Sequence, residues 1–207
     1  MIASFRDKGT EDVFDGRDTK QARKACPSDL VRVARRKLDQ LNQAGVLGDL
    51  RAPPSNRLEK LKGEREGLYS IRINDQWRVC SGGPIPAPKT LRSWTTTEET
   101  ETEMTNVRIP SDRQPTPPGE MLLEEFIRPL GMTQAELADR IGVSYVRLNE
   151  IVNGRRGITP STALRLAKAL GTSAQFWLNG QLALDLYKAS HDEEELRQLE
   201  RIEPVSH

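Results

Sequence analysis

The sequence predicts two domains, a small α+β unit followed by an all-helical unit, joined by a linker. Residues 1–80 alternate helical and strand patterns, whereas residues 118–189 are helical in period throughout. Between them, residues 81–117 carry Pro, Thr and Glu runs with too little apolar surface to offset the entropy of ordering, which predicts a flexible linker. Residues 190–207 form an acidic tail.

Composition and charge narrow the class of protein. No stretch of the 207 residues reaches the roughly 18 consecutive apolar residues of a membrane span, and the first residues are charged, so we expect a cytoplasmic protein with no membrane partner. Two cysteines and two histidines form no ligand pattern, so no disulfide framework, metal site or cofactor is expected. Residues 1–80 carry 17 Lys and Arg against 12 Asp and Glu, whereas residues 181–207 carry 3 against 7. A basic first segment fits a polyanion partner or an ordinary solvated surface.

The first unit shows three local patterns. Residues 2–5 are a candidate strand, and residues 28–45 repeat apolar positions at helical spacing. Residues 68–80 alternate apolar and polar positions around a turn at residues 74–75, which predicts two antiparallel strands.

The helical unit contains two short helices joined by a turn. Thr133 and Glu136 form a capping box at the start of the first helix, which Gly142 ends. Ser144 caps the second helix, which ends at residues 153–154. Further amphipathic helices precede and follow this pair, giving five helices in one compact domain.

The spacing within the helix pair is typical of a DNA-binding helix-turn-helix. Counting from Gln134, the small residue Ala138 is fifth and Gly142 is ninth. The fourth, eighth, tenth, fifteenth and eighteenth positions are the apolar Leu137, Ile141, Val143, Leu148 and Ile151. In this geometry the second helix enters the major groove. The alternative is a helical hairpin packed only for stability.

Candidate DNA contacts follow from that geometry. Tyr145, Arg147 and Asn149 are predicted to face outward and read base edges, Arg147 pairing with guanine and Asn149 with adenine. Predicted phosphate contacts, which position the protein without reading sequence, are Thr133, Gln134, Ser144, Arg155 and Arg156. For each residue the alternative is a solvated side chain without a ligand.

Residues of this unit resemble HigA antitoxins. The resemblance rests on PGEML at 118–122, NEIVNGRRGIT at 149–159, TALRLA at 162–167 and GTS at 171–173. It implies a λ-repressor-like homodimer that binds the palindromic operator DNA of its own operon and neutralises a HigB-like toxin. Met104 stands where such a protein would begin.

The first unit resembles HigB toxins of the RelE/ParE superfamily. The resemblance rests on RLEKLKG at 57–63 and GLYSIRINDQWRVC at 67–80. It implies a ribosome-dependent endoribonuclease that cuts mRNA, with Lys62 and Arg78 as basic catalytic residues and Glu59 where some members carry histidine. RNA cleavage requires such cations at the phosphate. The family's closing Asp-Tyr-His strand is missing here, so an incomplete domain is expected and two ordinary exposed cations are favoured over catalysis.

The linker offers an explanation for the missing strand. Back-translating residues 81–97 with chosen synonymous codons and one added T gives FRWTDTGPENVEIVDYH in the shifted frame. The hypothesis is that a toxin gene and a downstream antitoxin gene were joined by a one-nucleotide slip after Cys80. The alternative is a natural fusion with a genuine linker.

Two functions follow from these observations. The favoured one is an operator-binding antitoxin and autorepressor carrying a truncated, inactive toxin remnant, with a HigB-like toxin as partner in cis or in trans. The alternative is an mRNA endoribonuclease, acting with the ribosome, that the fused antitoxin holds silent in cis. The acidic tail is interpreted as a solvated helix end, with a toxin-mimicking or dimer-contact segment as the alternative.

Overall fold

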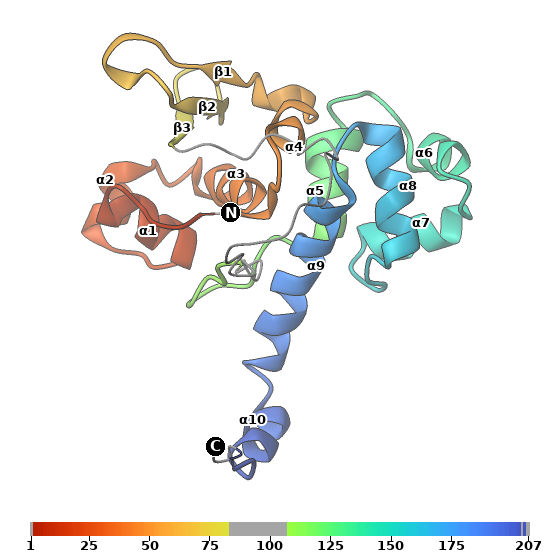
Figure 1. The fold of residues 1–207 in the computed structure, drawn as a ribbon. Helices are drawn as coiled ribbons and strands as arrows, with labels where there is room; N and C mark the ends of the chain where they lie inside the picture. Colours follow the sequence, from red (N-terminus) through yellow and green to blue (C-terminus); the bar gives the residue numbers. More distant parts are fainter. Residues whose placement is uncertain (1, 83–106, 204, 206–207) are drawn as a thin grey trace, which may run out of the picture.

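The computed structural model describes residues 2–82, 107–203 and 205, in two halves on either side of helix α9 (Figure 1). The elements of the N-terminal half are α1 (Lys8–Asp15), α2 (Lys20–Ala25), α3 (Val31–Gln43), α4 (Leu47–Arg51), η1 (Pro54–Asn56), β1 (Glu59–Lys60), η2 (Gly63–Arg65), β2 (Tyr69–Arg72) and β3 (Arg78–Ser81). Those of the C-terminal half are α5 (Pro118–Leu122), the π-helical turn η3 (Leu123–Ile127), α6 (Gln134–Arg140), α7 (Tyr145–Val152), α8 (Pro160–Leu170), α9 (Ala174–Ala189) and α10 (Glu193–Leu199).

The N-terminal core forms where α1, α2, α3 and the sheet meet. Its buried members are Val13, Phe14, Ala22, Cys26, Ala34, Leu38, Leu41, Ala44, Leu50 and Ile71. The helix predicted within residues 28–45 is confirmed as α3, and its apolar stripe faces this core. Helices α1 and α2 were not predicted. They are short and rich in charge, and they begin at the caps Asp7 and Thr19.

The sheet has three antiparallel strands in the order β1-β2-β3. The predicted hairpin is confirmed: Ile71 pairs with Val79, and the Asn74 side chain accepts hydrogen bonds from the amides of residues 76 and 77 in the turn. Strand β1, only two residues long, was not predicted. The strand expected at residues 2–5 was wrong, because a strand needs a ladder partner and this segment pairs with no described strand.

The segment that precedes the helical half is packed rather than free. Residues 83–106, which hold most of the proposed frameshift, lie outside the described residues. Residues 107–116, called the strap below, run along α1 and α3, and Val107 is buried. The Asn42 side-chain amide donates to the Arg108 carbonyl at 2.7 Å. The flexibility predicted for the whole of residues 81–117 therefore does not hold for the strap, because specific long-range contacts outweigh its polar composition.

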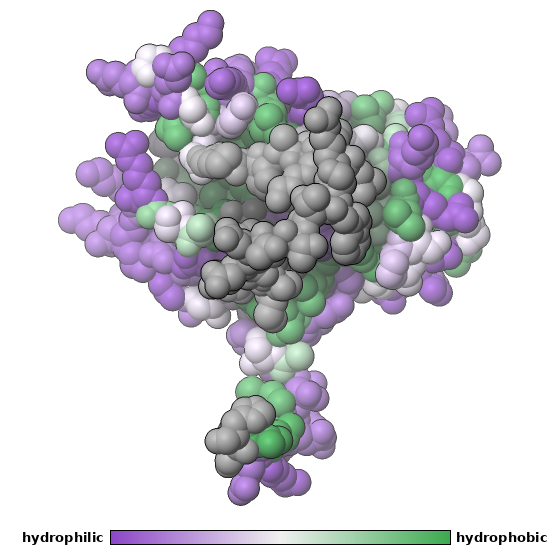
Figure 2. Space-filling model, in the orientation of Figure 1, coloured by the Kyte–Doolittle hydropathy of each residue, from purple (hydrophilic) through white to green (hydrophobic). Residues whose placement is uncertain are grey.

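The C-terminal half packs around Phe126, Phe176 and Trp177, whose rings contact one another. All five predicted helices are present, and α5 approaches α7 so closely that a Cβ on Gly119 would lie 1.9 Å from the Ile151 carbonyl oxygen. The end of α9 and then α10 extend away from this body (Figure 1). Figure 2 shows apolar surface on the α10 end, where Leu196, Leu199 and Ile202 are exposed. Within the described ranges no helix has the length and apolar character of a membrane span.

Candidate nucleic-acid interface

The predicted capping of the helix-turn-helix is confirmed. Thr133 Oγ1 accepts from the Glu136 amide at 3.2 Å, and the Glu136 carboxylate accepts from the Thr133 amide at 2.7 Å. The Thr133 amide and hydroxyl both donate to the Glu136 carboxylate, and these two bonds lower the pKa of Glu136. Gly142 turns the chain at φ 63°, and Ser144 accepts from the Arg147 amide at the start of α7. Helices α6 and α7 thus follow one another across a short turn, each with a capped N-terminus.

The first turn of α7 is exposed. The side chains of Tyr145 and Val146 are 53% and 64% exposed, and Ser144 is exposed beside them. The sequence prediction missed Val146, since it named only Tyr145, Arg147 and Asn149 as outward residues of this helix. Its position, two residues before the buried Leu148, places it on the opposite face of the helix.

Arg147 is not the outward residue that the spacing suggested. Its side chain is half-buried, and its Nη2 donates to Thr162 Oγ1 at 2.8 Å and Thr159 Oγ1 at 3.3 Å, at the start of α8. The reason is visible in the sequence, because Arg147 precedes the buried Ile151 by four residues and so lies on the same flank of α7. The side chain therefore links α7 to α8.

An amide chain holds Asn149 in place. The Asn149 side chain donates to Gln134 Oε1 at 3.1 Å, and the Asn153 side chain donates to the Asn149 side-chain oxygen at 3.1 Å. Gln134 and Asn149, both predicted contacts, are therefore brought together across α6 and α7.

The paired arginines flank a cleft of about 440 Å³ between the α5 start and α9. Arg155 is exposed, whereas Arg156 Nε pairs with Glu150 at 2.7 Å. The other polar side chains of the lining are Thr159, Gln181, Asp185 and Lys188. Across the described part of the chain, no three His, Cys, Asp or Glu side chains are grouped to hold a metal ion.

The candidate catalytic residues of the N-terminal half are only partly assembled. The Arg78 guanidinium donates to the Arg57 carbonyl at 2.5 Å and to Ser70 Oγ at 2.9 Å, and it lies 3.4 Å from the Glu59 carboxylate. Lys62 is exposed and makes no polar contact with the described residues. The structure thus joins Arg78 to Glu59 but not to Lys62.

Comparisons with known proteins match the two halves separately. Residues 3–81 match the family described as the RelE-like toxin of type II toxin-antitoxin system HigB, and residues 123–177 match a helix-turn-helix family. Toxin HigB-1 of Vibrio cholerae is 40% identical over 79 residues, which are 38% of this chain and 80% of that toxin. Antitoxin HigA-1 of the same organism is 43% identical over 75 residues, which are 36% of this chain and 70% of that antitoxin.

This chain belongs to the HigB toxin and HigA antitoxin families, one in each half. A solved structure of Pseudomonas aeruginosa antitoxin HigA with the higBA promoter is 37% identical and covers 45% of this chain and all of its own, with a TM-score of 0.41. Residues 2–82 are called the HigB-like half below, and residues 107–203 the HigA-like half.

A buried charge cluster joins the HigB-like and HigA-like halves. Lys37 of α3 donates to Glu125 of η3 at 2.5 Å, to Asn56 at 2.6 Å and to Ser55 at 3.0 Å, and Arg36 donates to Glu125 at 2.6 Å. The Lys37 and Glu125 side chains are each 2% exposed. Burial alone would raise the pKa of Glu125, but Lys37 and Arg36 outweigh it and hold that pKa below its ordinary value.

Helix α9 supplies the second contact between the halves. Asp49 of α4 accepts from the Ser173 amide at 2.6 Å, at the N-terminus of α9, where a carboxylate is favoured. Six residues further along α9, the buried Asn179 donates to the Gln43 carbonyl at 2.9 Å. The HigB-like half therefore occupies one side of α9, and Figure 1 shows the recognition helix α7 on the other side.

Proposed function

We propose that this chain is a sequence-specific DNA-binding antitoxin and transcriptional autorepressor of a type II toxin–antitoxin module, acting in the cytoplasm. The observation that carries the proposal is the exposed first turn of α7, where Tyr145 and Val146 stand free of the core beside Ser144. A helix that presents its N-terminal residues in this way reads base edges in the major groove. The HigB-like half leaves this face open, because its contacts are with α5, η3 and α9.

The contacts fall into two groups in this proposal. Tyr145, Val146 and Asn149 read bases, with Gln134 holding Asn149, and Arg147 positions α7 through α8. The phosphate contacts are Thr133, Gln134, Ser144, Arg155 and Arg156. A mobility-shift titration with the DNA upstream of the gene tests both groups. Replacing Arg155 and Arg156 together by Ala should weaken binding to all sequences and reduce the salt slope by about 2.

Base-reading variants should behave differently. Tyr145→Ala and Val146→Ala should weaken operator binding and leave non-specific binding nearly unchanged, since they remove base contacts and no charge. Arg23→Ala, which removes an exposed cation on α2, is the control. Undiminished operator binding after Tyr145→Ala with Val146→Ala would contradict the assignment of α7.

The binding unit in this proposal is a homodimer. Leu182 and Leu186 lie one turn apart in the second half of α9 and are 41% and 45% exposed. Dimers of helix-turn-helix domains read two half-sites about 34 Å apart, one with each copy. Leu182→Glu with Leu186→Glu should give a monomer in sedimentation and lose operator binding. A dimer that persists would place the interface elsewhere.

The HigB-like half is proposed to be an inactive toxin remnant. The family match ends at residue 81, the chain covers 80% of toxin HigB-1, and the Arg78 guanidinium is engaged by backbone and Ser70 oxygens. The alternative is a ribosome-dependent endoribonuclease silenced in cis, which the exposed Lys62 favours. Induced expression of the full chain with the contact between the halves weakened by Glu125→Gln together with Arg113→Gln distinguishes them. Growth arrest that Arg78→Ala abolishes would support the enzyme, and unimpaired growth would support the remnant.

A further inference from the structure

The strap completes the C-terminal end of helix α1. The last carbonyls of a helix have no partner within it. Arg113 Nε donates to the Phe14 carbonyl at 2.6 Å, and the Asp112 amide donates to the Asp15 carbonyl at 2.9 Å. Two carbonyls of the HigB-like half are therefore satisfied by residues of the HigA-like half.

Arg113 also reads a buried carboxylate on the neighbouring helix. Its two terminal nitrogens donate to the two oxygens of Asp39 in α3 at 2.8 and 2.6 Å. The side chains are 11% and 3% exposed, and the Thr116 hydroxyl and amide also donate to Asp39. A bidentate pair of this kind specifies geometry as well as charge, and it is the arrangement for which Arg is suited and Lys is not.

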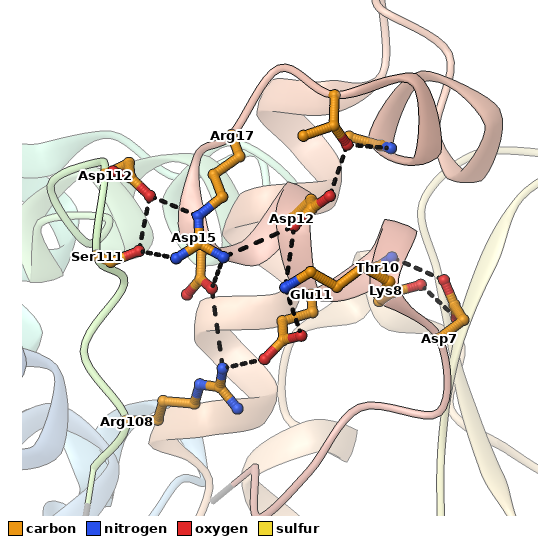
Figure 3. Close-up of polar contacts among 12 residues, drawn as sticks. Asp7, Lys8, Thr10, Glu11, Asp12, Asp15, Arg17, Arg108, Ser111 and Asp112 are labelled. Atoms are coloured by element: carbon orange, nitrogen blue, oxygen red, sulfur yellow. Dashed lines mark hydrogen bonds and ion pairs between the residues drawn. The ribbon is translucent and has the colours of Figure 1, made fainter.

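The surface around this pair is shaped for the strap. A Cβ on Gly16 would lie 2.7 Å from Arg113 Cβ, so the glycine that ends α1 at φ 96° also leaves room for the strap. The Arg113 guanidinium lies 5.4 Å from the centre of the Phe14 ring. Arg108 makes a second, more exposed contact with Glu11 at 2.6 Å, and Arg17 reaches back to Asp112 (Figure 3).

We propose that the strap is the segment by which the HigA-like half recognises a HigB-like toxin, and that Arg113 is its specificity-determining residue. The partner it fits presents a carboxylate at the place of Asp39 beside the open carbonyl end of its first helix. Vibrio cholerae HigB-1 and HigA-1 are separate proteins, so the surface that is intramolecular here corresponds to one between two chains. The inference concerns the contact between the halves and stands independently of operator binding.

The test measures how tightly the halves hold each other after the link is cut. A protease site is inserted between residues 90 and 95 of the full chain, the folded protein is cleaved, and dissociation of the labelled halves is followed after dilution. Arg113→Gln should speed dissociation about a hundredfold, because it leaves Asp39 buried and uncompensated. Arg113→Lys should fall between, since it keeps the charge and loses the fork. Arg32→Gln, which breaks the exposed pair with Glu120 across the two halves, is the matched control and should change little.

Specificity is tested by repeating the comparison on an Asp39→Asn background. If Arg113 reads Asp39, the preference for Arg113 over Arg113→Gln should shrink from about a hundredfold to less than about tenfold. An equal penalty on both backgrounds, or a wild-type rate for Arg113→Gln, would overturn the proposal. If a cleaved variant aggregates, amide hydrogen exchange is measured on the uncut chain instead. Arg113→Gln should then expose the strap and the end of α1 and leave α7 protected, and uniform loss of protection would also overturn it.

Discussion

The substitution Glu125→Gln tests whether the charge cluster holds the two halves together. The change keeps the size of the side chain but removes the counter-charge of Lys37 and Arg36, and it replaces one accepting oxygen by an NH2 group that can only donate. Lys37 is 2% exposed, so its ammonium has no water to replace the lost carboxylate. Removing one partner of a buried pair costs about 3–5 kcal/mol. For a cooperative unit of this size that corresponds to a fall of about 6–20 °C in the unfolding midpoint.

Calorimetry on the full chain is the assay. Arg32→Gln is the matched control, because Arg32 also joins α3 to the HigA-like half, pairing with Glu120 of α5 at 3.0 Å, but is 77% exposed. We expect the midpoint of this control to stay at the wild-type value. Equal unfolding midpoints for Glu125→Gln and Arg32→Gln would refute the reasoning. A lower midpoint for the HigB-like half alone would also refute it, if hydrogen exchange showed that the contact between the halves remained intact.

Three further outcomes are expected. Gly119→Ala should cost about 1–3 kcal/mol in urea unfolding, because the new methyl group meets the Ile151 carbonyl and α5 must shift. Asp49→Asn should lower the free energy of unfolding by about 1.5–3 kcal/mol and raise amide hydrogen exchange at the start of α9, because a buried charge that accepts from Ser173 is lost. Hydrogen bonds from Arg108 and Lys8 lower the pKa of Glu11 in the folded protein. Ionised Glu11 therefore stabilises the fold above pH 4.5, and this stabilisation is lost as the pH falls through the lower folded-state pKa. Exchange in the strap, corrected for intrinsic rates, should therefore rise in acid.

The parts of the fold that sequence could predict are those that local chemistry determines. Thr133 and Glu136 bond to each other within one turn of helix. Gly142 adopts the positive φ that ends the helix, which depends on its own backbone alone. The hairpin follows the same rule, since the Asn74 side chain makes its turn. Such signals need only a few neighbouring residues.

The parts that sequence missed depend on distant partners. The Arg147 side chain bonds to Thr162, fifteen residues away on α8. The prediction that it faces outward used only the residue spacing within α7, which carries no information about α8. The strap is polar and Pro-rich, yet Arg113 finds Asp39 at a separation of 74 residues. Composition predicts a flexible segment because it takes no account of distant partners. The prediction fails here because a buried carboxylate elsewhere in the chain requires a charged partner.

The strap is synthesised after the whole of the HigB-like half that it covers. Helix α1 leaves the ribosome about 5–20 s before the arginine that bonds to its last turn, given a separation of 99 residues and ordinary elongation rates. During that interval Asp39 has neither Arg113 nor Thr116, and the aromatic surface of Phe14 lacks its cover. The nascent HigB-like half is thus at its most vulnerable to proteolysis and aggregation before the HigA-like half is made. Translation that stops early leaves this half in that state.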